Sequence, residues 1–176
     1  EVLGSREWLA HCGSLSKVSS PGLRIGWLVA NADLLAKAVM CKQFSDAHTS
    51  TFAQATAAQY LLAGHMPSTL AKVRKVYAAR AQTMMDALRA ALGDAVAFTE
   101  PQGGLFLWVK LTGQCGKLAD ANVLAKKAIE AGVAFVSGAP FFSQNPDVST
   151  LRLSFATADE EKIREGVARL AKARAA

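Results

Sequence analysis

The chain has 176 residues, of which 51% are hydrophobic and 19% charged, with a formal net charge of +6 at pH 7. This much apolar side-chain surface excludes a disordered chain, because its burial can offset the conformational entropy lost on folding. Three widely spaced cysteines without a CxxC pair exclude a disulfide scaffold and suit reduced thiols in a cytoplasmic protein: Cys12, Cys41 and Cys115. No apolar run approaches the roughly 20 residues that span a bilayer.

The sequence begins at Glu1, without an initiator methionine and without the basic and apolar regions of a signal peptide. We therefore expect an excerpt of a longer protein or a processed product. Lysines and arginines are scattered along the helical stretches, and a basic stripe that would favour nucleic-acid binding is not evident.

The first third of the chain alternates between apolar runs and breakers. Residues 8–12 and 26–30 predict two buried strands, and residues 13–24 between them, rich in Gly, Pro and Ser, predict a loop. Asn31 is expected to cap a helix with an apolar stripe, and an Ala-rich second helix is expected over residues 51–62.

A long amphipathic helix is predicted over residues 68–92. Gly64 and Pro67 are expected to separate it from the preceding helix, and Gly93 to end it. Its apolar residues recur every three or four positions: Leu70, Val73, Tyr77, Ala81, Met84, Leu88 and Leu92. The boundary between two domains is expected within this helix.

The rest of the chain predicts a compact α+β unit with the order β-α-β-β-α. The expected elements are a strand at 105–111, a helix at 120–131 ended by Gly132, strands at 133–136 and 151–155, and a final helix. In the last strand, Leu151, Leu153 and Phe155 share one face. Thr157 and Glu160 predict a capping box for the final helix.

Metal chemistry is not predicted. His11, His48 and His65 lack ligand spacing, and no HExxH motif accompanies them. A catalytic pair of His11 and Cys12 fails on geometry, because adjacent side chains in a strand point to opposite faces.

The loop at residues 13–24 is the first candidate site. It carries Ser14, Ser16, Lys17 and Arg24 between two apolar strands and contains no carboxylate. Hydroxyl donors and a guanidinium fork suit an anion, and a lysine amine can react with a carbonyl group. A surface loop with solvated cations is the alternative, and the residues alone leave both open.

Arg152 is the second candidate. It stands opposite three large apolar residues in a strand that reads as buried, so its charge needs an anionic partner. That partner is either an acid from a distant helix or the carboxylate of a substrate.

Residues 13–27, GSLSKVSSPGLRIGW, resemble the lysine motif of fold-type I pyridoxal-phosphate enzymes. The likeness is to class I/II aminotransferases, in the branch of 2-aminoadipate and aromatic aminotransferases. The resemblance implies that Lys17 is the catalytic lysine and forms a Schiff base with pyridoxal 5′-phosphate. Ser14 and Arg24 then contact the cofactor phosphate, and Ser16 completes the expected cofactor-binding set.

Further landmarks follow in the order of that family. Residues 101–108 resemble its Gly-Gly-x-Phe strand. Residues 132–142 resemble its "GV…G…F" segment, in which Ser137-Gly138-Ala139 replaces the commoner Pro-Gly pairing. Residues 151–155 resemble the strand whose arginine, here Arg152, grips the substrate α-carboxylate.

The implied fold is α/β, the type I pyridoxal-phosphate-dependent transferase fold. Residues 1–67 would form the end of the large cofactor-binding domain, 68–92 the connecting helix and 93–176 the small α+β domain. The family's pyridine-stacking aromatic, its pyridine-nitrogen Asp and its phosphate-binding helix lie upstream of this motif and are not in the chain.

The expected function is transfer of an amino group between an amino acid and a 2-oxo acid, by a cytoplasmic homodimer without a membrane partner. The chain is expected to be a C-terminal portion that is inactive alone and that exposes apolar surface near Trp8 and Trp27, which favours self-association. One alternative is the aminotransferase-like effector domain of a GntR/MocR-type transcription regulator, which would bind nucleic acid only through an upstream winged helix. Another is a fold-type I lyase or decarboxylase.

Overall fold

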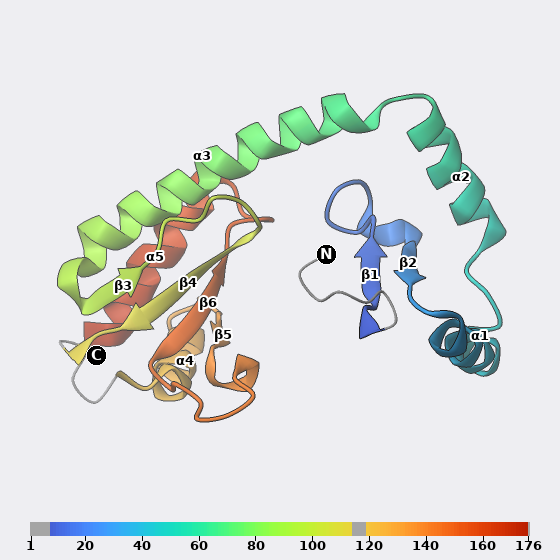
Figure 1. The fold of residues 1–176 in the computed structure, drawn as a ribbon. Helices are drawn as coiled ribbons and strands as arrows, with labels where there is room; N and C mark the ends of the chain where they lie inside the picture. Colours follow the sequence, from blue (N-terminus) through green and yellow to red (C-terminus); the bar gives the residue numbers. More distant parts are fainter. Residues whose placement is uncertain (1–7, 114–118, 176) are drawn as a thin grey trace. The chain divides into compact units, whose positions relative to one another are not determined.

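The computed structural model describes residues 8–113 and 119–175, so Cys115 lies outside the described residues. The chain divides into two compact units, Glu1–Val73 and Arg74–Ala176. Figure 1 shows the order of their helices and strands. Over the described ranges, none of the helices combines the length and apolar character needed to cross a membrane.

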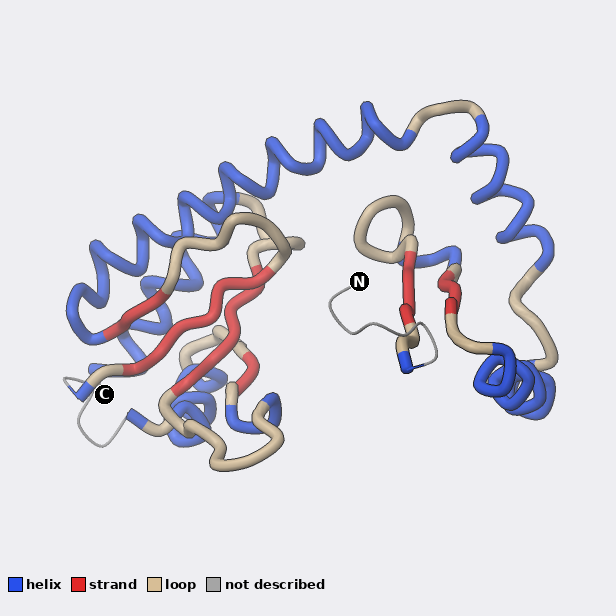
Figure 2. Tube along the Cα trace, in the orientation of Figure 1, coloured by secondary structure: helices blue, strands red, loops and turns tan. Residues whose placement is uncertain are grey.

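The first unit is built on a β-hairpin followed by two helices. Strands β1 (His11–Ser14) and β2 (Gly26–Val29) pair antiparallel, and α1 (Ala32–Asp46) and α2 (Thr51–Leu62) follow (Figure 2). Asn31 caps α1 as expected, because its side-chain oxygen accepts a hydrogen bond from the backbone N–H of Leu34 at 2.8 Å.

The burial that the apolar runs predict for the strands of this unit is wrong, whereas the exposed apolar surface expected near Trp8 and Trp27 is confirmed. Strand β1 begins at His11 rather than at residue 8 and extends into the expected loop through Ser14. Trp8 is 85% exposed and Val29 59% exposed, and α1 contains no buried residue. An apolar run in the sequence identifies side chains that a strand or helix is able to bury. Burial also needs a second layer, and this hairpin has no further strand paired to it within the described residues.

Helix α3 (Met66–Leu92) confirms the predicted long helix and starts two residues earlier than predicted. Pro67 therefore lies in its first turn instead of separating two helices, a position where the missing N–H costs no hydrogen bond. Gly93 follows with a φ of +48°. The buried residues of α3 lie toward its C-terminal end: Ala81, Met84, Met85, Leu88 and Leu92.

The second unit contains a four-stranded antiparallel sheet of order β3-β4-β6-β5. Its strands are β3 (Val96–Phe98), β4 (Phe106–Leu111), β5 (Val136–Ser137) and β6 (Thr150–Ser154), and its helices are α4 (Ala121–Glu130) and α5 (Glu160–Ala175). Side chains from α3, α4 and α5 join those of the sheet in one apolar core. In Figure 1, α5 runs beside the C-terminal part of α3.

The two faces of this sheet differ. On β4, Leu107 and Val109 are buried whereas Phe106 and Trp108 are each 39% exposed, because side chains alternate along a strand. On β6, Leu151 and Leu153 are buried, as predicted, and Arg152 lies on the other face. One face carries the core, and the other presents aromatic and polar side chains.

Three expectations for this unit need correction. Strand β3 is missing from the prediction, and the strand expected at 133–136 is the two-residue β5, so that Ser137 is not in a loop. Helix α5 begins at Glu160, and Asp159 caps it: the carboxylate accepts from the backbone N–H of Lys162 at 2.9 Å. The predicted capping role of Thr157 is therefore wrong, because Asp159 is also a strong cap and lies next to the first turn.

Asp147 anchors the loop that enters β6. Its carboxylate accepts hydrogen bonds from the hydroxyl and the backbone N–H of Ser149 at 2.6 and 3.0 Å, and from Lys110 Nζ at 2.9 Å. The hydroxyl of Ser149 first, and then Lys110, lower the pKa of Asp147 from 3.8 to about 2. The folded chain thus holds this group ionised more strongly than the unfolded chain does.

Because the pKa of Asp147 differs between the folded and the unfolded chain, part of the folding stability depends on pH. The contribution of Asp147 is present above its unfolded pKa of 3.8 and is lost as pH falls toward about 2. We expect Asp147→Asn to lower the thermal midpoint near neutral pH, and the gap to the unmodified protein to narrow across that acidic window. Thermal unfolding followed by circular dichroism over a pH series measures this. A gap that stays constant with pH would contradict it.

Candidate functional site

The loop between β1 and β2 is closed through the backbone of Leu15. The N–H of Leu15 donates to the carbonyl of Ile25 at 3.1 Å, and its own carbonyl accepts from the N–H of Ser19 at 2.9 Å. The side chain of Leu15 is buried. Residues 16–18 are therefore held as a turn at the end of the hairpin, and Lys17 lies at its centre.

The side chain of Lys17 is exposed, and in the part of the chain that the structure describes it makes no hydrogen bond or ion pair. A lysine that is held on a fixed turn and is not engaged by an acid keeps its amine available for a carbonyl group. The local sequence explains the turn, because serines and a Pro-Gly pair surround the lysine.

Ser14 and Ser16 are brought together by the same turn. The side-chain oxygen of Ser14, the last residue of β1, accepts a hydrogen bond from the backbone N–H of Ser16 at 3.1 Å. This contact uses a lone pair of Ser14 and leaves its hydroxyl proton free to donate to an anion. The loop thus presents two hydroxyl groups next to Lys17.

Arg24 lies at the other end of the loop, in the left-handed region with φ of 55°, directly after the short helix Pro21–Leu23. Its Nη1 donates to the carbonyl of Pro21 at 3.2 Å. A guanidinium has five N–H donors, so this bond leaves others available. Arg24 also lines a cavity of about 420 Å³ together with Thr49 and Ser50 at the start of α2.

The charge at that cavity is mixed. Asp46 also lines it, and this carboxylate is bound by Lys42 at 2.9 Å. Ser50 caps α2, whose N-terminus carries a partial positive charge. Arg24 and this helix end together favour an anion, as the sequence predicts for Arg24.

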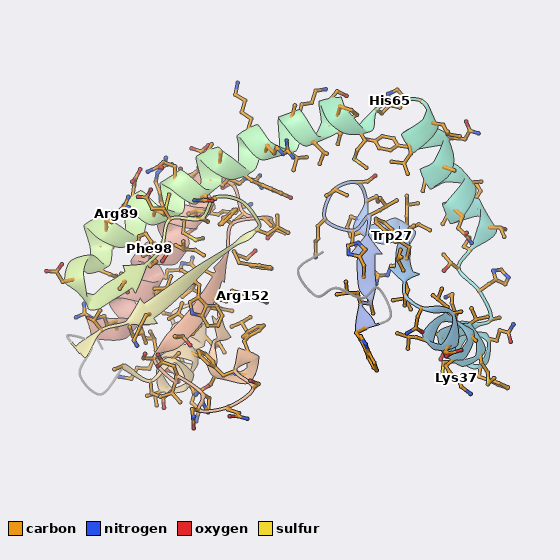
Figure 3. The ribbon with its side chains drawn as sticks, viewed as in Figure 1. Trp27, Lys37, His65, Arg89, Phe98 and Arg152 are labelled. Atoms are coloured by element: carbon orange, nitrogen blue, oxygen red, sulfur yellow. The ribbon has the colours of Figure 1, made fainter. Side chains whose placement is uncertain are left out.

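Trp27 is a neighbour of the site that sequence reasoning did not single out. It stands directly opposite Gly13 in the hairpin, and a Cβ on Gly13 would lie 2.0 Å from the Trp27 ring. Figure 3 shows this side chain on β2. The absence of a side chain on Gly13 therefore leaves the space that the Trp27 ring occupies beside the Lys17 turn.

Arg152 lies in the second unit, on the open face of the sheet, half-buried and paired in register with Trp108. Its guanidinium carbon is 4.1 Å from the centre of the Phe106 ring and 4.7 Å from that of Phe141. Figure 3 shows its position on the sheet. No acid among residues 8–113 and 119–175 forms an ion pair with it. Of the two partners predicted for Arg152, the acidic side chain from a distant helix is therefore not found in those ranges.

The aromatic surroundings of Arg152 were missed by the sequence reasoning. Phe141 packs edge-on against Trp108, with ring centres 5.6 Å apart, and Phe142 lies 6.2 Å from the same ring. The alternation of side chains along β4 could have predicted these neighbours, because it places Phe106 and Trp108 on the same face of the sheet as Arg152.

The family model for aminotransferase class I and II matches residues 2–170. The chain belongs to this family. It is 43% identical over 163 residues to the 2-aminoadipate transaminase of Thermus thermophilus, covering 93% of this chain and 40% of that relative. An uncharacterized HTH-type transcriptional regulator of Bacillus subtilis is 30% identical over 157 residues, covering 89% of this chain and 31% of the regulator.

Solved structures agree. The crystal structure of the T. thermophilus α-aminoadipate aminotransferase, complexed with N-(5′-phosphopyridoxyl)-L-leucine, superposes with a TM-score of 0.84 at 42% identity. The match covers 94% of this chain and 41% of that one. This confirms the expected type I transferase fold and the resemblance to the 2-aminoadipate branch. The chain spans about two fifths of the length of these aminotransferases.

Proposed function

We propose that the protein to which these residues belong is an aminotransferase that moves an amino group between an amino acid and a 2-oxo acid. The observation that carries the proposal is the amine of Lys17, which has no partner among residues 8–113 and 119–175 and lies on a hairpin turn, within a chain that the aminotransferase family model matches. Residues 1–67 would belong to the large domain, 68–92 to the connecting helix and 93–176 to the small domain.

The residues present fit pyridoxal phosphate. Lys17 would hold the cofactor covalently through Nζ, while Ser14, Ser16 and Arg24 would hold its phosphate, since a hydroxyl pair and a guanidinium with free donors suit that anion. When bound, the cofactor supplies an electron sink for negative charge at the substrate Cα.

The chain's own groups then have distinct tasks. Arg152 would bind the carboxylate of the amino acid through its fork of N–H donors and so fix the orientation of the Cα–H bond. Lys17 Nζ, once freed by the incoming amine, would take the proton from Cα, a form of general base catalysis worth about 10²- to 10⁴-fold in rate.

We also propose a cytoplasmic homodimer. The homodimer is supported by large apolar side chains of the first unit that are exposed, such as Phe44 (88% exposed) and Phe52 (80% exposed). Such side chains would be buried against another part of the whole protein or against a second copy of it. Among the described cysteines, Cys12 and Cys41 form no disulfide, and reduced thiols suit the proposed cytoplasmic location.

Borohydride reduction of the full-length protein, loaded with pyridoxal phosphate, tests the function. The visible absorbance of the cofactor should disappear, and peptide mapping should find the reduced label on Lys17. The 176-residue chain alone should bind the cofactor poorly and show no measurable turnover, because it lacks the rest of the pocket. A label on another lysine, or turnover by the isolated chain, contradicts these expectations.

A regulatory role is the second candidate, favoured by the similarity to the B. subtilis regulator. The regulatory role would be supported if a winged helix is encoded upstream of Glu1 and the full-length protein does not catalyse transamination. Product analysis separates a lyase or decarboxylase, because only an aminotransferase releases the 2-oxo acid and passes the amino group on.

A further inference from the structure

The guanidinium of Arg152 lies against two aromatic rings. Phe106 comes from β4 and Phe141 from the short helix Ala139–Phe141, and both rings lie within 5 Å of its guanidinium carbon, at 4.1 and 4.7 Å. We propose that Phe106 and Phe141 are positioning residues, which fix the guanidinium plane of Arg152 so that its N–H donors point to a carboxylate. The inference rests on the proposed substrate role of Arg152.

Ring stacking can fix an arginine without using its hydrogen-bond donors, because the ring attracts the face of the guanidinium and the donors lie in its plane. Arg89, in the same unit, shows the contrasting arrangement. It lies 5.4 Å from the Phe98 ring, but its Nη2 and Nη1 are engaged by Glu100 at 2.5 Å and by Asp86 at 3.4 Å. Figure 3 shows Arg89 and Phe98 together. Arg152 has the closer rings, and no acid within residues 8–113 and 119–175 engages its donors, which can therefore receive an incoming anion.

The ring of Phe141 is itself supported by the strand that carries Arg152. The N–H of Gly138 donates to the carbonyl of Thr150 in β6 at 2.7 Å, and the N–H of Phe141 donates to the carbonyl of Gly138 at 2.9 Å. A Cβ on Gly138 would lie 2.1 Å from Thr150 Oγ1, so the loop approaches β6 as closely as glycine allows. The ring of Trp108 also packs edge-on against the ring of Phe141. These backbone hydrogen bonds and ring contacts therefore fix the position of the Phe141 ring relative to Arg152.

Leucine variants of the two rings test the inference in the full-length protein loaded with pyridoxal phosphate. Phe106 and Phe141 are 39% and 52% exposed, so leucine leaves no closed cavity. Calorimetry measures the binding of two inert acids, propionate and hexanoate. We expect Phe106→Leu and Phe141→Leu each to weaken both acids by the same factor, about 3- to 10-fold. In steady-state kinetics, KM should rise by more than kcat falls.

Two controls accompany these variants. Phe106→Tyr and Phe141→Tyr keep the rings and should bind both acids within about 2-fold of the unmodified protein. Phe142→Leu is the matched control, because Phe142 is the next residue of the same loop and its ring contacts Trp108. It should also stay within about 2-fold.

The remaining outcomes decide against the inference in distinguishable ways. A loss that is larger for hexanoate than for propionate would mean that the rings contact the chain of the acid directly, and would overturn the positioning role. Unchanged binding in the leucine variants, while Arg152→Ala loses both acids, would overturn it as well and leave the proposed function intact. Unchanged binding in Arg152→Ala would remove the proposed substrate role of Arg152 itself.

Discussion

Replacing Lys17 with alanine in the full-length protein is expected to abolish covalent attachment of pyridoxal phosphate and to lower kcat by about 10³-fold. Two functions are lost together, because the same amine holds the cofactor and moves the proton at the substrate Cα. The structure supports a large effect, since Lys17 sits on a turn fixed by Leu15 and has no partner among the described residues to weaken its availability. Ser14 and Arg24 should still retain some cofactor without the covalent bond.

The measurement combines mass spectrometry after borohydride reduction with steady-state kinetics. Lys37→Ala is the matched control: Lys37 is an exposed lysine on α1 in the same unit, labelled in Figure 3. It should keep both the label and the rate. Persistent labelling of the Lys17→Ala variant would assign the cofactor to another lysine. Equal losses in both variants would show that the loss is not specific to Lys17.

The position of the lysine turn could be predicted because local signals decide it. Ser14, Lys17 and the Pro-Gly pair lie within a stretch whose composition favours turns in any context. The alternation of residues 151–155 likewise placed Arg152 opposite the core, which β6 confirms. Such features depend on neighbours in sequence.

Burial and contacts between distant segments could not be predicted in this way. Trp8 and Val29 look like core residues but are exposed, because burial depends on which layers pack against the hairpin. Phe141 meets Arg152 only because Gly138 holds its loop against Thr150, a contact that no local pattern encodes. The prediction of the cap of α5 was wrong for a different reason: two acceptable capping residues, Thr157 and Asp159, lie close together, and Asp159 accepts the hydrogen bond.

Arg152→Ala is expected to raise KM for the amino acid by about 10- to 100-fold, because a charge-assisted hydrogen bond to a carboxylate contributes about 1.5–3 kcal/mol. Arg152→Lys should recover only part of this loss. Lysine keeps the positive charge, but it lacks the planar fork and stacks less well on Phe106 and Phe141. The lysine variant therefore separates the contribution of charge from that of geometry.

Arg89→Ala is the matched control, because Arg89 also stacks on a ring in the same unit while Glu100 and Asp86 occupy its donors. These ion pairs are solvent-exposed, so their loss should change the stability by about 1 kcal/mol or less and leave KM unchanged. Steady-state kinetics and thermal unfolding of both variants give the comparison. If the two substitutions shift KM alike, the free donors of Arg152 do not bind the substrate. If only Arg152→Ala shifts KM while both variants keep their thermal midpoints, Arg152 is the arginine that receives the carboxylate.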